Sequence, residues 1–317
     1  MSTGSEERGR SEPAAAWAPA AEAVEISNRT PRTTRVAGGE WGAVALGAPF
    51  VGAGVMTAVL LGREHWASPG HSELPPSAMA ALGLCFAITG AALVAHGLRG
   101  VARRRGAAAV RRRYPEQPWM WDFAWDRQGG RDVAPAEAGR LLAITGFLAL
   151  FLVPLHWIAF ASDESPGIFQ VVTALFDLLG AVLLARVVFL ALRRIRFGAS
   201  RIRFARFPFA AGGVVEIALD GVSRRARAVP ITATLRHVEE REEVRESVGE
   251  RETRTTSYEL WRETRTVAPG APVVTFAVPA GAPGTALSAH PARYWELELH
   301  ADLPGVDYRG RFLVPVY

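Results

Sequence analysis

The chain has 317 residues, a formal net charge of +5, 49% hydrophobic residues and a single cysteine. This length allows one large domain or two ordinary domains. The single cysteine excludes a disulfide framework, and it also excludes an iron–sulfur cluster and a zinc site built from several cysteines.

Residues 1–40 are rich in Ser, Glu, Ala, Pro, Arg and Thr and show no hydrophobic periodicity. Such a composition predicts a disordered tail. The first 30 residues contain no apolar stretch of the kind that a signal peptide requires, so we expect no cleaved signal sequence.

Four apolar runs follow the tail, at 41–62, 77–98, 141–160 and 168–192. A hydrocarbon core about 30 Å thick needs about 20 apolar residues in helical form, so each run is long enough to cross. Core helices of a soluble bundle would need polar faces at helical spacing, and the first two runs lack them. The sequence predicts a bundle of four transmembrane helices over 41–192. In the second run, Gly83, Ala87, Ala91 and Ala95 form a ridge of small residues for close helix packing.

Arginine placement predicts the orientation. The connection 99–140 holds ten arginines, 193–206 holds six, and three more precede the first run, whereas 63–76 and 161–167 together hold one. Arginine-rich loops stay in the cytoplasm, so we expect both termini and the loop 99–140 inside and a location in the bacterial inner membrane. Two triplets in this loop are expected to lie at the membrane surface and attract anionic lipid headgroups. They are Arg103, Arg104, Arg105, Arg111, Arg112 and Arg113. Topogenic arginines need no nucleic-acid partner, and we expect none.

Residues 193–317 change to short alternating runs that predict strands. The runs are 213–219, 228–237, 258–267, 272–279, 293–301 and 309–316, and Asp-Gly and Pro-Gly turns separate several of them. In one run Trp295, Leu297 and Leu299 share one face. The pattern predicts an all-β sandwich. The charged segment 239–257 is expected to be a long hairpin tip or loop, either merely solvated or used as a docking surface.

Several motifs support a resemblance. They are Arg196-Phe197-Gly198-Ala199-Ser200, Tyr294-Trp295-Glu296-Leu297, Ala301-Asp302-Leu303-Pro304-Gly305-Val306-Asp307-Tyr308, the ending Phe312-Leu313-Val314-Pro315-Val316-Tyr317, and Tyr114-Pro115-Glu116-Gln117-Pro118-Trp119-Met120-Trp121. Together they resemble bacterial four-span membrane proteins of uncharacterised role. The resemblance implies a C-terminal cytoplasmic β-sandwich of arrestin-like or immunoglobulin-like type, and it implies no activity.

Asp177 and Arg186 are charged residues inside the fourth run. A charge at the centre of a span costs about 2.5–3.5 kcal/mol on insertion scales, so it is a candidate functional group. Nine residues separate the two, which places them on opposite sides of a helix. Asp177 can meet His156 or another polar group, either as part of a proton or cation relay or as a structural hydrogen-bond partner. Arg186 can extend towards the cytoplasmic headgroups.

Trp119, Trp121 and Trp125 lie close together in the loop 99–140. Their rings suit the membrane interface, packing against the β-sandwich, or an aromatic platform for a ligand.

We expect no enzyme, no cofactor and no metal. The first outer loop offers His65 and His71 with Glu64 and Glu73, a pattern that a solvated loop explains as well as zinc does. Cys85 lies among apolar residues, where a thiol is inert. The sequence predicts a non-catalytic, membrane-anchored binding or scaffold module with a protein partner at the β-sandwich; the alternative is a small transporter or channel that uses Asp177.

Overall fold

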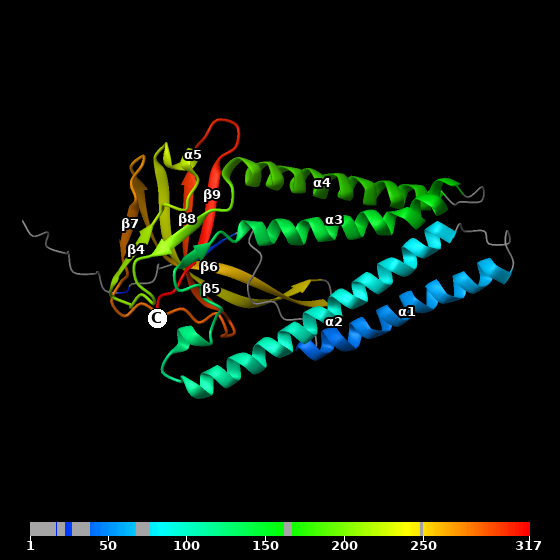
Figure 1. Cartoon of the computed structure of the whole chain (residues 1–317), viewed down its shortest axis with the longest axis horizontal. Coiled ribbons are helices and arrows are strands. Elements are labelled where there is room, and N and C mark those ends of the chain that lie inside the picture. Colours follow the sequence, from blue (N-terminus) through cyan, green and yellow to red (C-terminus); the bar gives the residue numbers. More distant parts are fainter. Residues whose placement is uncertain (1–16, 18–22, 27–38, 68–75, 162–166, 248–249) are drawn as a thin grey trace, which may run out of the picture. The chain divides into compact units, whose positions relative to one another are not determined.

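The computed structural model describes residues 17, 23–26, 39–67, 76–161, 167–247 and 250–317. The chain forms two compact units, one of helices and one of strands (Figure 1). The helical unit comprises Thr34–Pro115 and Val133–Gly198. The β unit combines described residues from three separate stretches, Met1–Thr33, Glu116–Asp132 and Ala199–Tyr317.

The helical unit contains α1 Gly39–Ala67, α2 Pro76–Arg113, α3 Ala134–His156 and α4 Gly167–Phe197, and a π-helix, Trp157–Ala161, continues α3. All four α-helices are long and apolar enough to cross a membrane. Large apolar side chains on α4 point outward; Leu178, for example, is 64% exposed. A lipid environment accommodates such side chains, and the predicted four-helix membrane domain is confirmed.

Helix α2 is longer than its apolar run. The first part of the predicted loop 99–140 is helical as far as Arg113, so both arginine triplets lie on the last turns of α2. Alanine and arginine are strong helix formers, and cations are favoured near the C-terminal end of a helix. The loop therefore begins after Arg113.

Glycines allow α1 and α2 to pack at close range. A Cβ atom added to Gly47 would lie 2.7 Å from the carbonyl oxygen of Gly90, and one added to Gly54 would lie 2.5 Å from that of Gly83. Gly83, Gly90 and Gly97 recur every seven residues, which is two helical turns. The predicted ridge is therefore present at Gly83 and Ala87, but it continues through Gly90, because Ala91 is exposed.

The β unit consists of two antiparallel sheets. The five-stranded sheet has the order β1-β6-β5-β8-β9, and the four-stranded sheet has the order β2-β3-β4-β7. The strands are β1 Val24–Glu25, β2 Gly129–Arg131, β3 Arg201–Phe204, β4 Val214–Ala218, β5 Ile231–Ser247, β6 Glu250–Val267, β7 Val273–Ala277, β8 Arg293–Ala301 and β9 Tyr308–Val314. A short helix, α5 Arg224–Arg227, precedes β5.

The core lies between the inner faces of the two sheets. Trp295, Leu297 and Leu299 on β8 are fully buried, as the alternation predicts, and Phe276 on β7 is buried as well. The predicted β-sandwich is confirmed, but the β unit is wider than 193–317. It also contains β2 from the central loop and β1 from residues 1–40. Trp17 and 23–26 are thus ordered parts of the β unit where a disordered tail was expected, and the rest of 1–38 lies outside the described residues.

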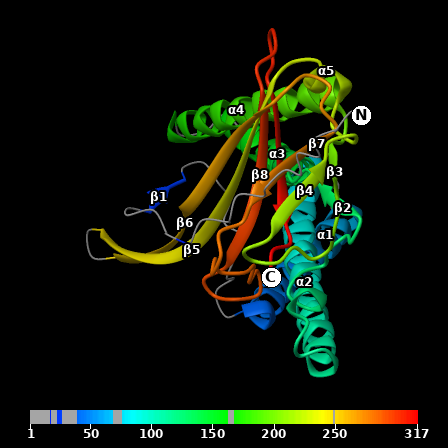
Figure 2. The same cartoon turned by 90° about the vertical axis from the view of Figure 1, so that its left-hand side faces the viewer.

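Strands β5 and β6 extend past the rest of their sheet. Pairing of β5 with β8 ends at Glu239, whereas pairing of β5 with β6 continues to Ser247 and Glu250. Residues 241–247 and 250–256 therefore form a curved two-stranded projection, which we call the arm (Figure 2). Of the two alternatives for 239–257, a hairpin tip or a loop, the described backbone forms the hairpin.

Replacing Gly90 with Ala tests the packing of α1 on α2. The new Cβ would lie 2.5 Å from backbone atoms of Gly47 and Val51, so the helices must separate. Overpacking of this kind costs about 1–3 kcal/mol. We expect Gly90→Ala to lower the melting temperature of the detergent-purified protein. Gly52→Ala is the matched control, because no atom lies within 4 Å of its added Cβ. Equal melting temperatures for the two variants would contradict the close packing.

Candidate functional site

A short segment near the N-terminus binds the edge of the five-stranded sheet. Val24 pairs with Glu259 and Glu25 with Tyr258, which adds β1 as a strand to the outer edge of β6. The N–H of Ile26 donates to the carbonyl oxygen of Ser257 at 2.8 Å. The sheet therefore already accepts an extended peptide by strand addition.

Trp17 of the same segment packs on the inner face of this sheet. His237, Trp261 and Trp295 stand side by side on β5, β6 and β8 in matching register. The Trp17 ring lies 5.4 Å from the His237 ring at 82° and 6.2 Å from the Trp295 ring at 63°. These are edge-to-face contacts of the favourable kind. The Trp17 N–H donates to the carbonyl oxygen of Ala280 at 2.9 Å, which fixes the backbone as well.

His237 is fully buried beneath Trp17. Neither of its ring nitrogens has a hydrogen-bond partner among the described residues. Burial and, secondarily, the positive charge of Arg293 lower the pKa of His237 to about 4. The imidazole is therefore neutral near pH 7 and behaves there as part of an aromatic cluster.

Ile26 reaches the outer face of the sheet. Val238, Tyr294 and Leu313 form a small buried cluster there, and Ile26 and Trp125 cover it. The segment thus passes from Trp17 on the inner face, along the edge of β6, to Ile26 on the outer face. We call the sheet residues that receive it the tail-binding surface; they are His237, Val238, Ser257, Tyr258, Glu259, Trp261, Tyr294, Trp295 and Leu313.

The loop 116–132 is fixed to the C-terminal strands by a buried carboxylate. Asp122 Oδ2 accepts hydrogen bonds from the N–H of Leu287 and from the Tyr317 hydroxyl, both at 2.9 Å, and Oδ1 accepts from the N–H of Ser288 at 2.7 Å. Trp125 Nε1 donates to the Tyr317 oxygen at 2.8 Å. Burial, and then the Asp122 charge, raise the pKa of Tyr317 above its ordinary value. The tyrosine therefore stays protonated and donates.

The structure brings two of the three loop tryptophans together. The rings of Trp119 and Trp125 lie 6.0 Å and 6.3 Å from the ring of Tyr317. Trp121 is half-buried in the same loop. This geometry is the expected packing against the β-sandwich for Trp119 and Trp125, and a ligand platform at the three rings stays a prediction.

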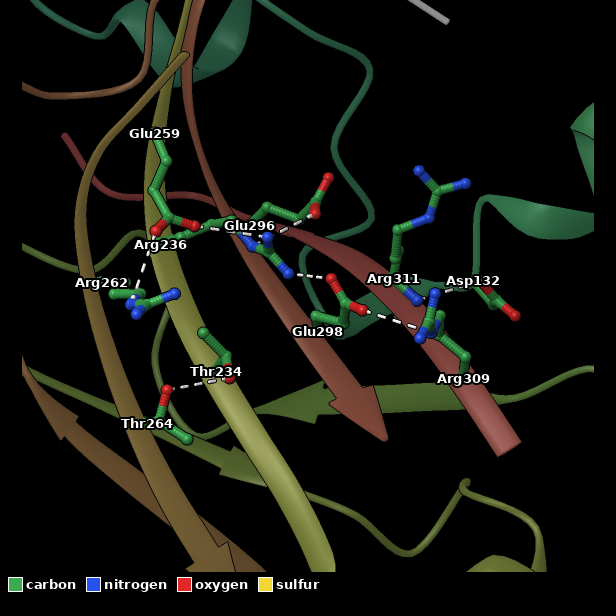
Figure 3. A network of polar contacts seen from close by, with 10 residues as sticks. All are labelled: Asp132, Thr234, Arg236, Glu259, Arg262, Thr264, Glu296, Glu298, Arg309 and Arg311. Carbon is green, nitrogen blue, oxygen red and sulfur yellow. Dashed lines mark hydrogen bonds and ion pairs between the residues drawn. The ribbon is translucent and has the colours of Figure 1, made fainter. Parts of the chain in front are cut away.

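A network of ion pairs crosses the outer face of the sheet (Figure 3). Arg236, only 12% exposed, contacts Glu298, Glu259 at 3.4 Å and Glu296 at 3.8 Å. Arg262 and Arg309 contact the outer ends of the same set, at Glu259 and Glu298. Three guanidinium groups thus face three carboxylates on β5, β6, β8 and β9. A network paired in this way links the side chains of neighbouring strands.

Within the helical unit, Asp177 on α4 meets His156 on α3. The distance from His156 Nε2 to Asp177 Oδ2 is 3.2 Å, and His156 Nδ1 lies 2.9 Å from the carbonyl oxygen of Leu152. A carbonyl only accepts, so Nδ1 carries a hydrogen and Nε2 is the nitrogen that faces Asp177. The meeting of Asp177 with His156, which the sequence left open, is present.

Other candidate groups are dispersed. Arg186 is exposed on α4, and the described residues show no ion pair between it and Asp177. In the first triplet Arg104 forms an ion pair with Glu40 of α1, and Cys85 is a buried free thiol. His71 and Glu73, and the side chains of Glu64 and His65, lie outside the described part. His300, Asp302 and Asp307 are close enough to hold a cation, but Asp302 and Asp307 are exposed and Asp307 already accepts the Leu303 N–H.

Comparison of the sequence with protein-family models and with curated proteins finds no match. The resemblance to four-span bacterial membrane proteins therefore stays a prediction. What the geometry adds is the tail-binding surface, which sequence patterns did not indicate. The one available signal was Trp17, an isolated large aromatic residue in an otherwise polar stretch.

The buried His237 predicts a loss of stability in acid. Its pKa in the folded protein, about 4, is below the ordinary value of about 6.5, so the unfolded chain takes up the proton first as the pH falls. The stabilising contribution is present above pH 6.5 and is lost between pH 6.5 and 4, with a total of about 3 kcal/mol. We expect the melting temperature of the wild type to fall relative to His237→Phe over this range, measured by tryptophan fluorescence. Parallel curves for the two proteins would refute the assignment.

Proposed function

We propose that this protein is a non-catalytic, membrane-anchored module whose β unit binds an extended segment of a protein partner at the cytoplasmic face of the bacterial inner membrane. The observation that supports it most is the pairing of β1 with β6, because a partner strand could pair with the same sheet edge in the same way. The four apolar helices supply the anchor.

The arm continues the same edge beyond β1. From Ser257 towards the tip, β6 has no further strand on its outer edge among the described residues, and β5 has none beyond Glu240. A two-stranded hairpin without other packing is marginally stable in water, and a third strand from a partner would stabilise it. The sequence of the arm is rich in charged residues, a composition that protects open sheet edges from non-specific pairing.

Two observations support the cytoplasmic side of the membrane for the β unit: the distribution of arginines and the three chain stretches that make up the unit. The tail segment, the loop 116–132 and residues 199–317 belong to one folded unit, so they must share one side. The helices α1 and α2 would then cross the membrane and return to that side, and α3 and α4 would do the same. Because arginine-rich loops are retained in the cytoplasm, this shared side is the inner one.

Photocrosslinking in native membranes tests partner binding. The carbonyl of Ser257 points to β1, so the N–H of Thr255, two residues away, points to the same open edge. A photoreactive residue at Arg254 should give an adduct of defined mass, and Thr255→Pro should abolish it without affecting expression, because proline removes that N–H. The same probe at Thr275 on β7 is the control. No adduct at 254, or one that persists in Thr255→Pro, would contradict strand addition by a partner.

The pair His156–Asp177 favours a second candidate function, proton-linked transport. Three features accompany the 3.2 Å contact. The helix changes to π geometry directly after His156, the two side chains are each nearly half exposed, and the fully buried Thr173, one turn before Asp177, has no hydrogen-bond partner among the described residues. π-Helical turns are frequent at functional sites.

Reconstituted vesicles separate this candidate from a structural pair. If the pair carries protons, Asp177→Asn abolishes the acidification driven by an imposed voltage, as reported by an enclosed pH dye. Gln170→Ala, which alters an exposed polar residue of the same helix, should leave it unchanged. Absence of flux in the wild type, or equal flux in Asp177→Asn, would leave the pair with a purely structural role.

A further inference from the structure

Three arginines share the exposed face of the antiparallel strand pair β2–β3, whose two strands are separated in the chain by α3 and α4. Arg131 lies opposite Arg201 and Gly129 lies opposite Arg203, while Ile202 between them is buried in the core. The N–H of Asp132 donates to the carbonyl oxygen of Ser200, and the N–H of Phe204 donates to that of Gln128. Hydrogen-bonded pairs thus lie on either side of the pairs Arg131–Arg201 and Gly129–Arg203. Arg131 and Arg201 therefore form a non-hydrogen-bonded pair, in which side chains on neighbouring strands lie closest.

Arg131 and Arg201 differ from Arg203 in their surroundings. Arg203 binds Asp220 with both ends of its guanidinium group, and this contact lowers the pKa of Asp220. No carboxylate lies within ion-pair distance of Arg131 or Arg201 in the described part of the chain. Like charges directly opposite each other destabilise a strand pair. An anion between the two guanidinium groups would offset this repulsion.

The same face contains a pocket of suitable size. Its volume is about 260 Å³, and Gly129, Gly130 and Gly221 form part of its wall together with the three arginines. Asp126 and Asp220 also line it, and Asp220 is paired with Arg203. A Cβ on Gly221 would lie 2.6 Å from the carbonyl oxygen of Arg201, so no side chain can occupy that position. The wall at these glycines is bare backbone, which allows a small anion to approach closely.

We propose that Arg131 and Arg201 bind the phosphate of an anionic lipid headgroup. Arginine pairs recognise phosphate oxygens through charge-assisted hydrogen bonds. Chain connectivity favours a lipid source: Arg131 stands three residues before α3, and Arg201 stands four residues after α4 ends. At about 3.6 Å per residue, both lie within about 15 Å of the ends of helices that can span the membrane. Headgroups occupy this zone.

The proposal predicts opposite effects with and without lipid. Without anionic lipid, Arg131→Gln and Arg201→Gln should leave the melting temperature of the full-length protein unchanged or raise it, because each relieves a like-charge contact. With phosphatidylglycerol, the double variant should bind about tenfold more weakly than the wild type, measured by native mass spectrometry of retained lipid. Arg224→Gln with Arg225→Gln is the control, since it removes the same charge from exposed residues of α5 in the same unit.

Three comparisons decide the source of the phosphate. Retention of phosphatidylglycerol above phosphatidylcholine in the wild type and the control, and its loss in the double variant and in each single variant, supports the headgroup site. Equal loss in the control double variant would show that only total charge matters and would overturn it. Stabilisation by inorganic phosphate that depends on Arg131 and Arg201, without preference for phosphatidylglycerol, would overturn the lipid assignment in favour of a soluble phosphate.

Discussion

The β unit depends on one constraint: it is assembled from three stretches of chain that the helices separate. Asp122 of the central loop binds the backbone of Leu287 and Ser288 and the hydroxyl of Tyr317, and β1 of the tail pairs with β6. Buried hydrogen bonds and strand pairs of this kind form only if all three stretches share one aqueous side. The even number of helices between them satisfies that requirement, so the fold of the β unit and the topology of the anchor support each other.

The same arrangement relates the binding surface to the membrane anchor. The tail segment that leads towards α1 occupies the edge of β6, and the loop that leads to α3 carries β2 and Trp125. A partner strand on the arm would bind an open edge of the five-stranded sheet, whereas a phosphate beside Arg131 and Arg201 would bind the four-stranded sheet.

Sequence patterns predicted the elements that are long enough to show an apolar run or a clear alternation. The apolar runs identified four helices, and the parity of Trp295, Leu297 and Leu299 identified the core face of β8. The strands β1, β2 and β3 were not predicted, because two to four residues are too few for alternation to be recognised. Their stability also comes from partner strands that are distant in sequence. The extension of α2 to Arg113 was missed because an arginine-rich stretch was assigned to a loop by its charge. Of the candidate site residues, Asp177 contacts His156, one of the neighbours that the sequence allowed. The contact of Trp17 with His237 could be found only from the structure, because it depends on the sheet register.

Cysteine accessibility tests the shared side of the three stretches most directly. In a Cys85→Ala background, single cysteines replace Glu25, Ala124, Ser288 and, in the predicted outer loop, Ser72, and intact cells receive a membrane-impermeant maleimide. We expect labelling at position 72 in intact cells, and labelling at positions 25, 124 and 288 only after the membrane is permeabilised. Labelling of one or two of these three positions in intact cells, with the others protected, would contradict a single β unit on one side of the membrane.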